Sequence, residues 1–167
     1  IFLAVPTVFG LSVPLFPFVI RGLSLPPVLS DKKALITMIW DTAWLFLTIF
    51  VICSQSGDMD GLRNGNIISV ILMTGVWLVF LTARYLPANR WIKGGIIIII
   101  AGIWTAFSDD MYLLLSEHKK QLTILSASFM DWSSDLHINA NIYLICLICS
   151  IIIGAFLIIT GILKRDR

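Results

Sequence analysis

The chain has 167 residues, of which 58% are hydrophobic and only 13% are charged. A soluble domain is about half apolar and about one quarter charged, and a soluble protein of this size could not cover so much apolar surface. The net charge of +2, spread over small scattered groups of Lys and Arg, excludes the basic surface of a nucleic-acid-binding protein.

Five apolar segments predict membrane spans, because a span needs about 17 to 25 residues to cross the hydrocarbon layer. We therefore expect an all-α integral membrane protein, a bundle of about five transmembrane helices in a single domain, with one longer extracytoplasmic connection. In chain order, the predicted spans cover residues 1–20, 35–54, 66–86, 92–108 and 140–163.

The first segment contains three prolines, Pro6, Pro14 and Pro17, with Gly10 between them. Each interior proline removes a helical hydrogen bond. Membrane helices tolerate such breaks where neighbouring helices or water satisfy the freed carbonyls. We expect a kinked span, and the alternative is a re-entrant or interfacial segment.

The second segment contains its only acid, Asp41, between Trp40 and Trp44. Tryptophans are typical of the head-group region, so anchoring at the interface or a structural ion pair is the main interpretation. The alternative is a role in handling protons or ions, because acids inside spans mark functional sites.

The connections also carry predictions. Residues 55–65 contain three glycines and predict a turn-rich loop. Residues 87–91 predict a tight corner that makes the third and fourth helices antiparallel neighbours. The fourth segment is short, and its helix is expected to extend beyond Asp110 into residues 111–115.

Small residues recur at helical spacing in the last two segments, which predicts faces where helix backbones approach closely. The CxxC formed by Cys146 and Cys149 is interpreted in the same way, since no histidine or second CxxC lies on that helix to complete a metal site. The predicted packing residues are Gly95, Gly102 and Ala106 on one helix, and Cys146, Ser150, Gly154 and Gly161 on the other.

The connection 109–139 contains both histidines and several acids, but their spacing matches no metal motif, so no metal site is predicted. Apolar residues recur there at intervals of three and four, which predicts an amphipathic helix over residues 119–132. Such a helix would lie on the membrane surface, cap the bundle or dock a partner. The predicted partner-binding residues are Leu122, Leu125, Phe129 and Trp132.

Lys and Arg alternate between the two sides of the five-span topology. Because cytoplasmic loops carry the excess of these residues, we expect the N-terminus outside, the C-terminus in the cytoplasm, and a location typical of a bacterial inner membrane. Nine basic residues then lie inside and three outside: inside are Arg21, Lys32, Lys33, Arg84, Arg90, Lys93, Lys164, Arg165 and Arg167, and outside are Arg63, Lys119 and Lys120.

No catalytic or nucleotide-binding motif is found in the sequence. We therefore expect a non-enzymatic protein without cofactor that acts through contacts with another membrane or extracytoplasmic protein or with itself. It would be an accessory subunit of a membrane assembly or an immunity-type inhibitor of a membrane toxin. The alternative is an oligomeric transporter or channel component that uses the proline-broken first segment and Asp41.

Overall fold

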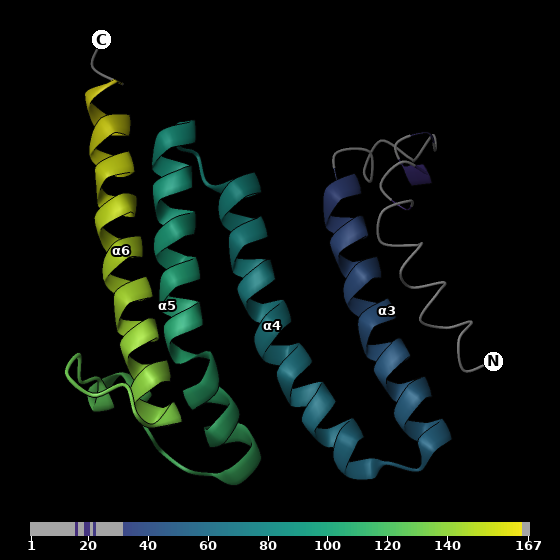
Figure 1. Cartoon of the computed structure of the whole chain (residues 1–167). Helices are drawn as coiled ribbons and strands as arrows, with labels where there is room; N and C mark the ends of the chain where they lie inside the picture. Colours follow the sequence, from purple (N-terminus) through teal and green to yellow (C-terminus); the bar gives the residue numbers. More distant parts are fainter. Residues whose placement is uncertain (1–15, 17–18, 21, 23–31, 165–167) are drawn as a thin grey trace. The chain divides into compact units, whose positions relative to one another are not determined.

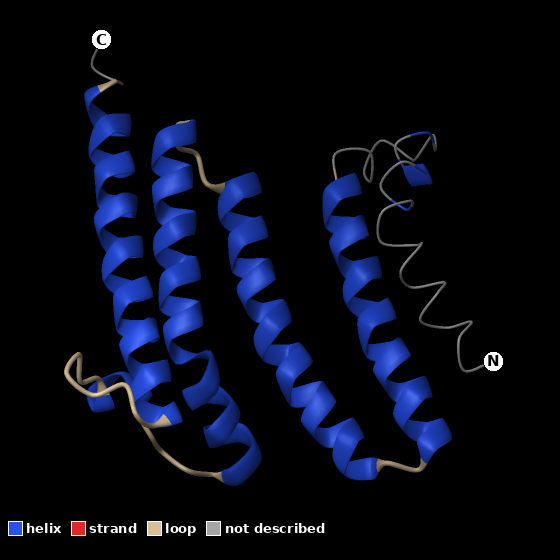
Figure 2. Cartoon of the chain, viewed as in Figure 1, coloured by secondary structure: helices blue, strands red, loops and turns tan. Residues whose placement is uncertain are grey.

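The computed structural model describes residues 16, 19, 20, 22 and 32–164 (Figure 1). Every regular element from residue 32 to residue 164 is helical (Figure 2). Within the described residues, four helices are long and apolar enough to cross a membrane, so the predicted all-helical membrane protein is confirmed in that form. The first predicted span, residues 1–20, lies outside the described residues apart from positions 16, 19 and 20. The four helices are α3 (Lys33–Ser56), α4 (Met59–Tyr85), α5 (Arg90–Glu117) and α6 (Asp135–Leu163).

The chain divides into two compact units, residues 1–70 and 71–167, and α4 contributes to both. In the first unit a two-residue turn joins α3 to α4. Gly57 takes a left-handed conformation with φ of 70°, which ends α3, and the Asp58 side chain accepts a 2.7 Å hydrogen bond from the Gly61 backbone N–H. This cap starts α4 directly after the turn. The predicted loop 55–65 is therefore wrong, since Gly61 and Gly65 lie within the helix.

Helices α5 and α6 are longer than their predicted spans. Helix α5 continues past Asp110, as expected, and ends at Glu117, where His118 adopts a left-handed conformation with φ of 55°. Helix α6 begins at Asp135, where the Ser134 hydroxyl accepts a hydrogen bond from the His137 N–H. A helix of 28 residues measures about 42 Å, and the hydrocarbon layer is about 30 Å thick. Helix α5 is therefore longer than that layer is thick.

The closest helix contact lies between α5 and α6, which run side by side (Figure 1). A Cβ atom added at Gly95 would lie 2.5 Å from the Gly154 carbonyl oxygen, and one added at Gly154 would lie 2.7 Å from the Gly95 carbonyl oxygen. A Cβ atom added at Gly102 would meet the Ser150 side chain at its Cβ atom. The two helices are therefore in direct backbone contact, which only very small residues permit.

The predicted small residues do not all contribute their side chains to this contact. Gly95, Gly102, Ser150 and Gly154 are buried, whereas the thiol of Cys146 is exposed. Cys146 contributes its carbonyl oxygen, which lies 3.6 Å from a Cβ added at Gly102. The side chain of Cys149 is exposed as well.

One end of the α5–α6 pair combines basic and aromatic side chains. Asn89 caps α5 by accepting a 2.9 Å hydrogen bond from the Ile92 N–H, and its amide donates a 2.6 Å bond to the Gly161 carbonyl of α6. Lys164 lies over the Trp91 ring, 4.3 Å from its centroid. The Lys93 ammonium donates to the Ala83 carbonyl at the end of α4, a favourable place for a cation.

The part of α4 in the second unit packs against α5 through one large ring. The indole N–H of Trp104 donates a 3.0 Å hydrogen bond to the Ile71 carbonyl of α4. Gly75 leaves room for the ring, because a Cβ there would lie 2.6 Å from Trp104 Nε1. Trp104 therefore satisfies its polar atom inside an apolar contact.

The predicted amphipathic helix over residues 119–132 is replaced by an irregular connection with one short 3₁₀ turn, η1 (Thr123–Ser126) (Figure 2). The physical reason is competition for backbone groups. The N–H of Thr123 donates to the Asp110 side chain, and the N–H of Ser128 donates to the Asn141 side chain. Both donors would otherwise enter a helical ladder.

The backbone contact yields a matched prediction on two adjacent glycines. We expect Gly95→Ala to destabilise the protein by about 1–3 kcal/mol, because the added methyl group meets the Gly154 carbonyl. Gly94→Ala should be neutral or should stabilise by up to about 1 kcal/mol, because its Cβ meets only Leu157 Cδ1 at 4.0 Å and alanine favours the helix. Unfolding in mixed detergent micelles, followed by circular dichroism, measures both. Equal effects at the two positions would contradict the contact.

Candidate functional site

The connection between α5 and α6, residues 118–134, is held by side chains from both helices. The Oδ1 atom of Asp110 on α5 accepts hydrogen bonds from the Thr123 N–H at 3.0 Å and the Thr123 hydroxyl at 2.5 Å. Asp110 is only 7% exposed. This carboxylate therefore fixes the first half of the connection against α5.

The second half is fixed by Asn141 on α6, which is 0% exposed. Its side-chain oxygen accepts a 2.7 Å hydrogen bond from the Ser128 N–H. Its amide donates to the carbonyls of Ser128 at 2.8 Å and Asp131 at 3.2 Å. One side chain thus bonds three backbone groups of an irregular segment, of which the Ser128 carbonyl also accepts from the Asp131 N–H at 3.0 Å.

His137, in the first turn of α6, adds a third attachment. Its Nδ1–H donates to the Ser126 carbonyl at 2.7 Å, since a carbonyl can only accept. Its Nε2 lies 3.5 Å from Asp131 Oδ2. The hydroxyl and backbone N–H of Ser133 donate to Asp131 and hold the pKa of that carboxyl below its usual value. His137 therefore helps to hold the conformation of the connection.

An apolar turn projects from this framework and consists of Phe129, Met130 and Trp132. Met130 is 100% exposed, and the other two are about half exposed at 55% and 47%. The indole N–H of Trp132 donates to the Phe129 carbonyl at 2.9 Å, which holds the two residues next to each other. Three large apolar side chains are thus exposed on a segment whose backbone is held by hydrogen bonds from the side chains of α6.

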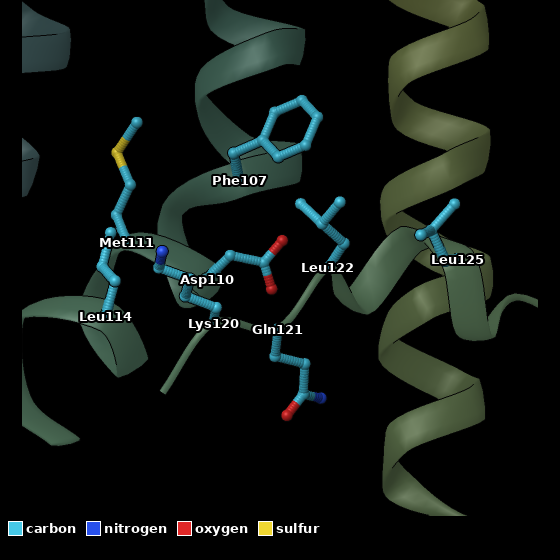
Figure 3. A pocket seen from close by; sticks show the side chains of 8 residues that line it. All are labelled: Phe107, Asp110, Met111, Leu114, Lys120, Gln121, Leu122 and Leu125. Carbon is cyan, nitrogen blue, oxygen red and sulfur yellow. The ribbon is translucent and has the colours of Figure 1, made fainter. Parts of the chain in front are cut away.

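The remaining two residues of the predicted partner-binding set lie elsewhere. Leu122 and Leu125 border a pocket of about 650 Å³ at the end of α5 (Figure 3). The structure therefore separates the predicted set into two pairs, one on the apolar turn and one at the pocket. An amphipathic helix would have placed all four on one face. The pocket is lined by Phe107, Asp110, Met111, Leu114, Lys120, Gln121, Leu122 and Leu125.

Asp110 leaves one polar atom of this pocket region without a partner. Its Oδ2 atom is buried and accepts no hydrogen bond within residues 32–164. A buried polar atom without a partner costs about 1–3 kcal/mol, and such atoms are uncommon in folded proteins. Asp110 is thus both an anchor of the connection and an unsatisfied acceptor.

Asp41, the predicted intramembrane acid, lies on α3 in the first unit. It is half-buried, and its Oδ1 atom likewise lacks a hydrogen-bond partner in the described part of the chain. Trp40 and Trp44 pack edge to face with ring centroids 5.7 Å apart, and Phe16 stacks on Trp40 at 4.7 Å. The aromatic setting agrees with a position near the head groups.

Sequence reasoning missed Asn141, the anchoring role of Asp110, and Met130. A usable signal was present for Asn141, because a buried position near the start of an apolar helix is expensive for an amide unless its hydrogen-bond partners are supplied.

Asp109 on α5 also contacts α6, because its carboxylate accepts a short hydrogen bond from the Tyr143 hydroxyl. No group of three His, Cys, Asp or Glu residues suited to a metal ion is found from residue 32 to residue 164.

Comparisons with models of known families, with curated proteins and with solved structures found no match to this chain. The candidate site is therefore described by its own geometry.

The Asn141 anchor can be tested by limited proteolysis. We expect Asn141→Ala to make the bonds after Phe129 and Trp132 cleave faster with chymotrypsin in mild detergent, and to lower stability by about 1–3 kcal/mol, because the Ser128 N–H loses its hydrogen-bond acceptor. Asn139→Ala is the matched control, since Asn139 is exposed and lies two positions earlier on α6. Equal cleavage of the two variants would show that Asn141 does not hold the connection.

Proposed function

We propose that this protein is a small, non-enzymatic membrane protein that binds a partner protein through the apolar turn. The observation that carries the proposal is the contrast between Asn141, which is fully buried, and Met130, which is fully exposed. A buried amide that fixes a backbone in order to expose large apolar side chains is typical of a binding loop on a rigid scaffold. Aromatic residues and methionine are also enriched in protein interfaces.

The polar surroundings of the turn favour a protein partner over simple anchoring in lipid. The indole N–H of Trp132 is used within the turn, on the Phe129 carbonyl, whereas an interfacial anchor directs that group to the lipid head groups. Asp131 lies within the turn and Asp135 follows it, and ionised carboxylates are expensive to bring into lipid.

The charge distribution supports an external position for the connection and a cytoplasmic C-terminus. The α4–α5 corner and the end of α6 carry Arg84, Arg90, Lys93 and Lys164 at one end of the second unit. The other end carries most of the acids, with Lys119 next to Glu117 at 2.6 Å. Since positive charge collects on the cytoplasmic side, the apolar turn is proposed to face outward from a bacterial inner membrane.

A second candidate function is a subunit of an oligomeric transporter or channel, and it rests on Asp41. Its unpartnered Oδ1 atom is the feature that a proton or cation site in a membrane would present. A homo-oligomer that purifies without any other protein would favour this candidate. A stoichiometric second protein would favour the partner-binding function.

The topology gives a labelling prediction. In a background with Cys53, Cys146 and Cys149 replaced by Ser, we expect Met130→Cys to react with a membrane-impermeant maleimide on intact cells, since Met130 is fully exposed. Lys164→Cys, at the end of α6, should react only after the cells are opened. The opposite pattern would place the apolar turn in the cytoplasm.

The binding role gives a purification prediction. We expect replacement of Phe129, Met130 and Trp132 with Ser to leave membrane accumulation intact. Recovery of a co-purifying partner should fall by about tenfold or more, because truncation of each hot-spot residue in an interface costs about 2 kcal/mol or more of binding free energy. Replacement of Leu122 and Leu125 with Ser is the control, because these residues border the pocket instead. Undiminished recovery with the triple variant would exclude the apolar turn as the binding surface.

A further inference from the structure

With the basic start of α5 at the cytoplasmic interface, as in the topology proposed above, the pocket at the other end of α5 lies at the depth of the lipid head groups. Asp110 follows Arg90, the first residue of α5, by twenty positions, and twenty helical residues span about 30 Å, the thickness of the hydrocarbon layer. Phe107, Met111 and Leu114 lie on one face of the helix at spacings of four and three and line the pocket. Its apolar wall therefore follows α5 from acyl-chain depth to head-group depth.

The pocket has two residues of opposite charge, Asp110 and Lys120, and one neutral polar residue, Gln121. Asp110 lies in the wall with a buried, unpartnered Oδ2 atom, while its Oδ1 atom is used by Thr123. Lys120 and Gln121 are exposed at the rim. In Figure 3 the Lys120 side chain lies on the same side of the connection as the Asp110 carboxylate, whereas the Gln121 side chain points away from it. No salt bridge joins Lys120 to Asp110 within residues 32–164.

This combination selects a class of ligand. An apolar wall suits an acyl chain, a buried carboxylate oxygen requires a donor that is preferably cationic, and a lysine at the rim suits a phosphate as a point charge. A phospholipid with a primary ammonium group supplies all three within one molecule. A soluble cation would leave the apolar wall unused.

We propose that this pocket binds an aminophospholipid of the outer leaflet, with its ammonium group donating to Asp110 Oδ2, its phosphate at Lys120 and one acyl chain along Phe107, Met111 and Leu114. The Oδ2 atom is closed to solvent, so the ammonium reaches it when the rim side chains Lys120, Gln121 and Leu122 move aside. All three are exposed, and exposed side chains change rotamer on the picosecond to nanosecond timescale.

The test compares head groups on the purified full chain. The protein in mild detergent is mixed with phosphatidylethanolamine, phosphatidylcholine or phosphatidylglycerol of identical acyl chains, and retained lipid is measured by native mass spectrometry. We expect phosphatidylethanolamine to be retained about tenfold more strongly, because only its head group gives Asp110 a cationic hydrogen-bond donor. Equal retention of the three lipids, or of phosphatidylethanolamine and phosphatidylglycerol, overturns the proposal.

Variants assign the preference to the pocket. Asp110→Asn keeps the oxygen that accepts from Thr123 and should reduce phosphatidylethanolamine retention to the level of phosphatidylcholine, whereas Asp109→Asn on the exposed neighbour should not. Lys120→Gln should weaken retention of both lipids equally, because both contain the phosphate. A preference for phosphatidylethanolamine that survives Asp110→Asn overturns the proposal.

A third variant separates pocket occupancy from folding. Leu122→Trp fills the rim of the pocket without altering a hydrogen bond of the connection, and it should reduce retention of phosphatidylethanolamine while the thermal unfolding midpoint stays unchanged. Unchanged retention in this variant places the lipid elsewhere on the protein and overturns the proposal.

Discussion

The contact on which the rest of the second unit depends is the direct backbone approach of α5 and α6 at Gly95 and Gly154. Lipid offers no hydrophobic driving force for helix association, since acyl chains are as apolar as leucine. The stabilisation must then come from van der Waals contact, which is greatest where backbones meet. Because neither residue has a side chain, each helix lies in the groove of the other, and this sets the separation of the two helices along the whole pair.

That separation places polar groups opposite each other at both ends of the pair. At one end Asn89 reaches the Gly161 carbonyl, and at the other the Tyr143 hydroxyl reaches Asp109. Asp109 follows Asn89 by twenty positions, which corresponds to about 30 Å of helix. The polar contacts therefore border an apolar zone about as thick as the hydrocarbon layer.

Above this zone the two helices continue and hold the irregular connection with buried polar side chains. Asp110 and Asn141 are expensive residues to bury, yet each satisfies backbone groups that an irregular segment leaves free. The same two anchors give the proposed sites their character. Asn141 fixes the segment that exposes Met130, and the unpartnered oxygen of Asp110 is the basis of the proposed preference of the pocket for a cationic donor.

The sequence alone determined the membrane class and the cores of four helices, because apolar runs of span length have few other stable solutions. It also identified the glycines at positions 95, 102, 154 and 161 as small packing residues, although only the tertiary structure decided that the faces of α5 and α6 meet each other. Helix ends were less predictable. Residues 55–65 carry turn residues, yet capping by Asp58 allows α4 to begin at Met59. A helix was also predicted, wrongly, from the periodic spacing of Leu122, Leu125, Phe129 and Trp132. Such a pattern reports the spacing of apolar side chains, but it does not show which side chains elsewhere accept hydrogen bonds from the backbone N–H groups. Asp110 and Asn141 come from helices on either side of the connection, so their capture of the Thr123 and Ser128 N–H groups exists only once α5 and α6 are packed.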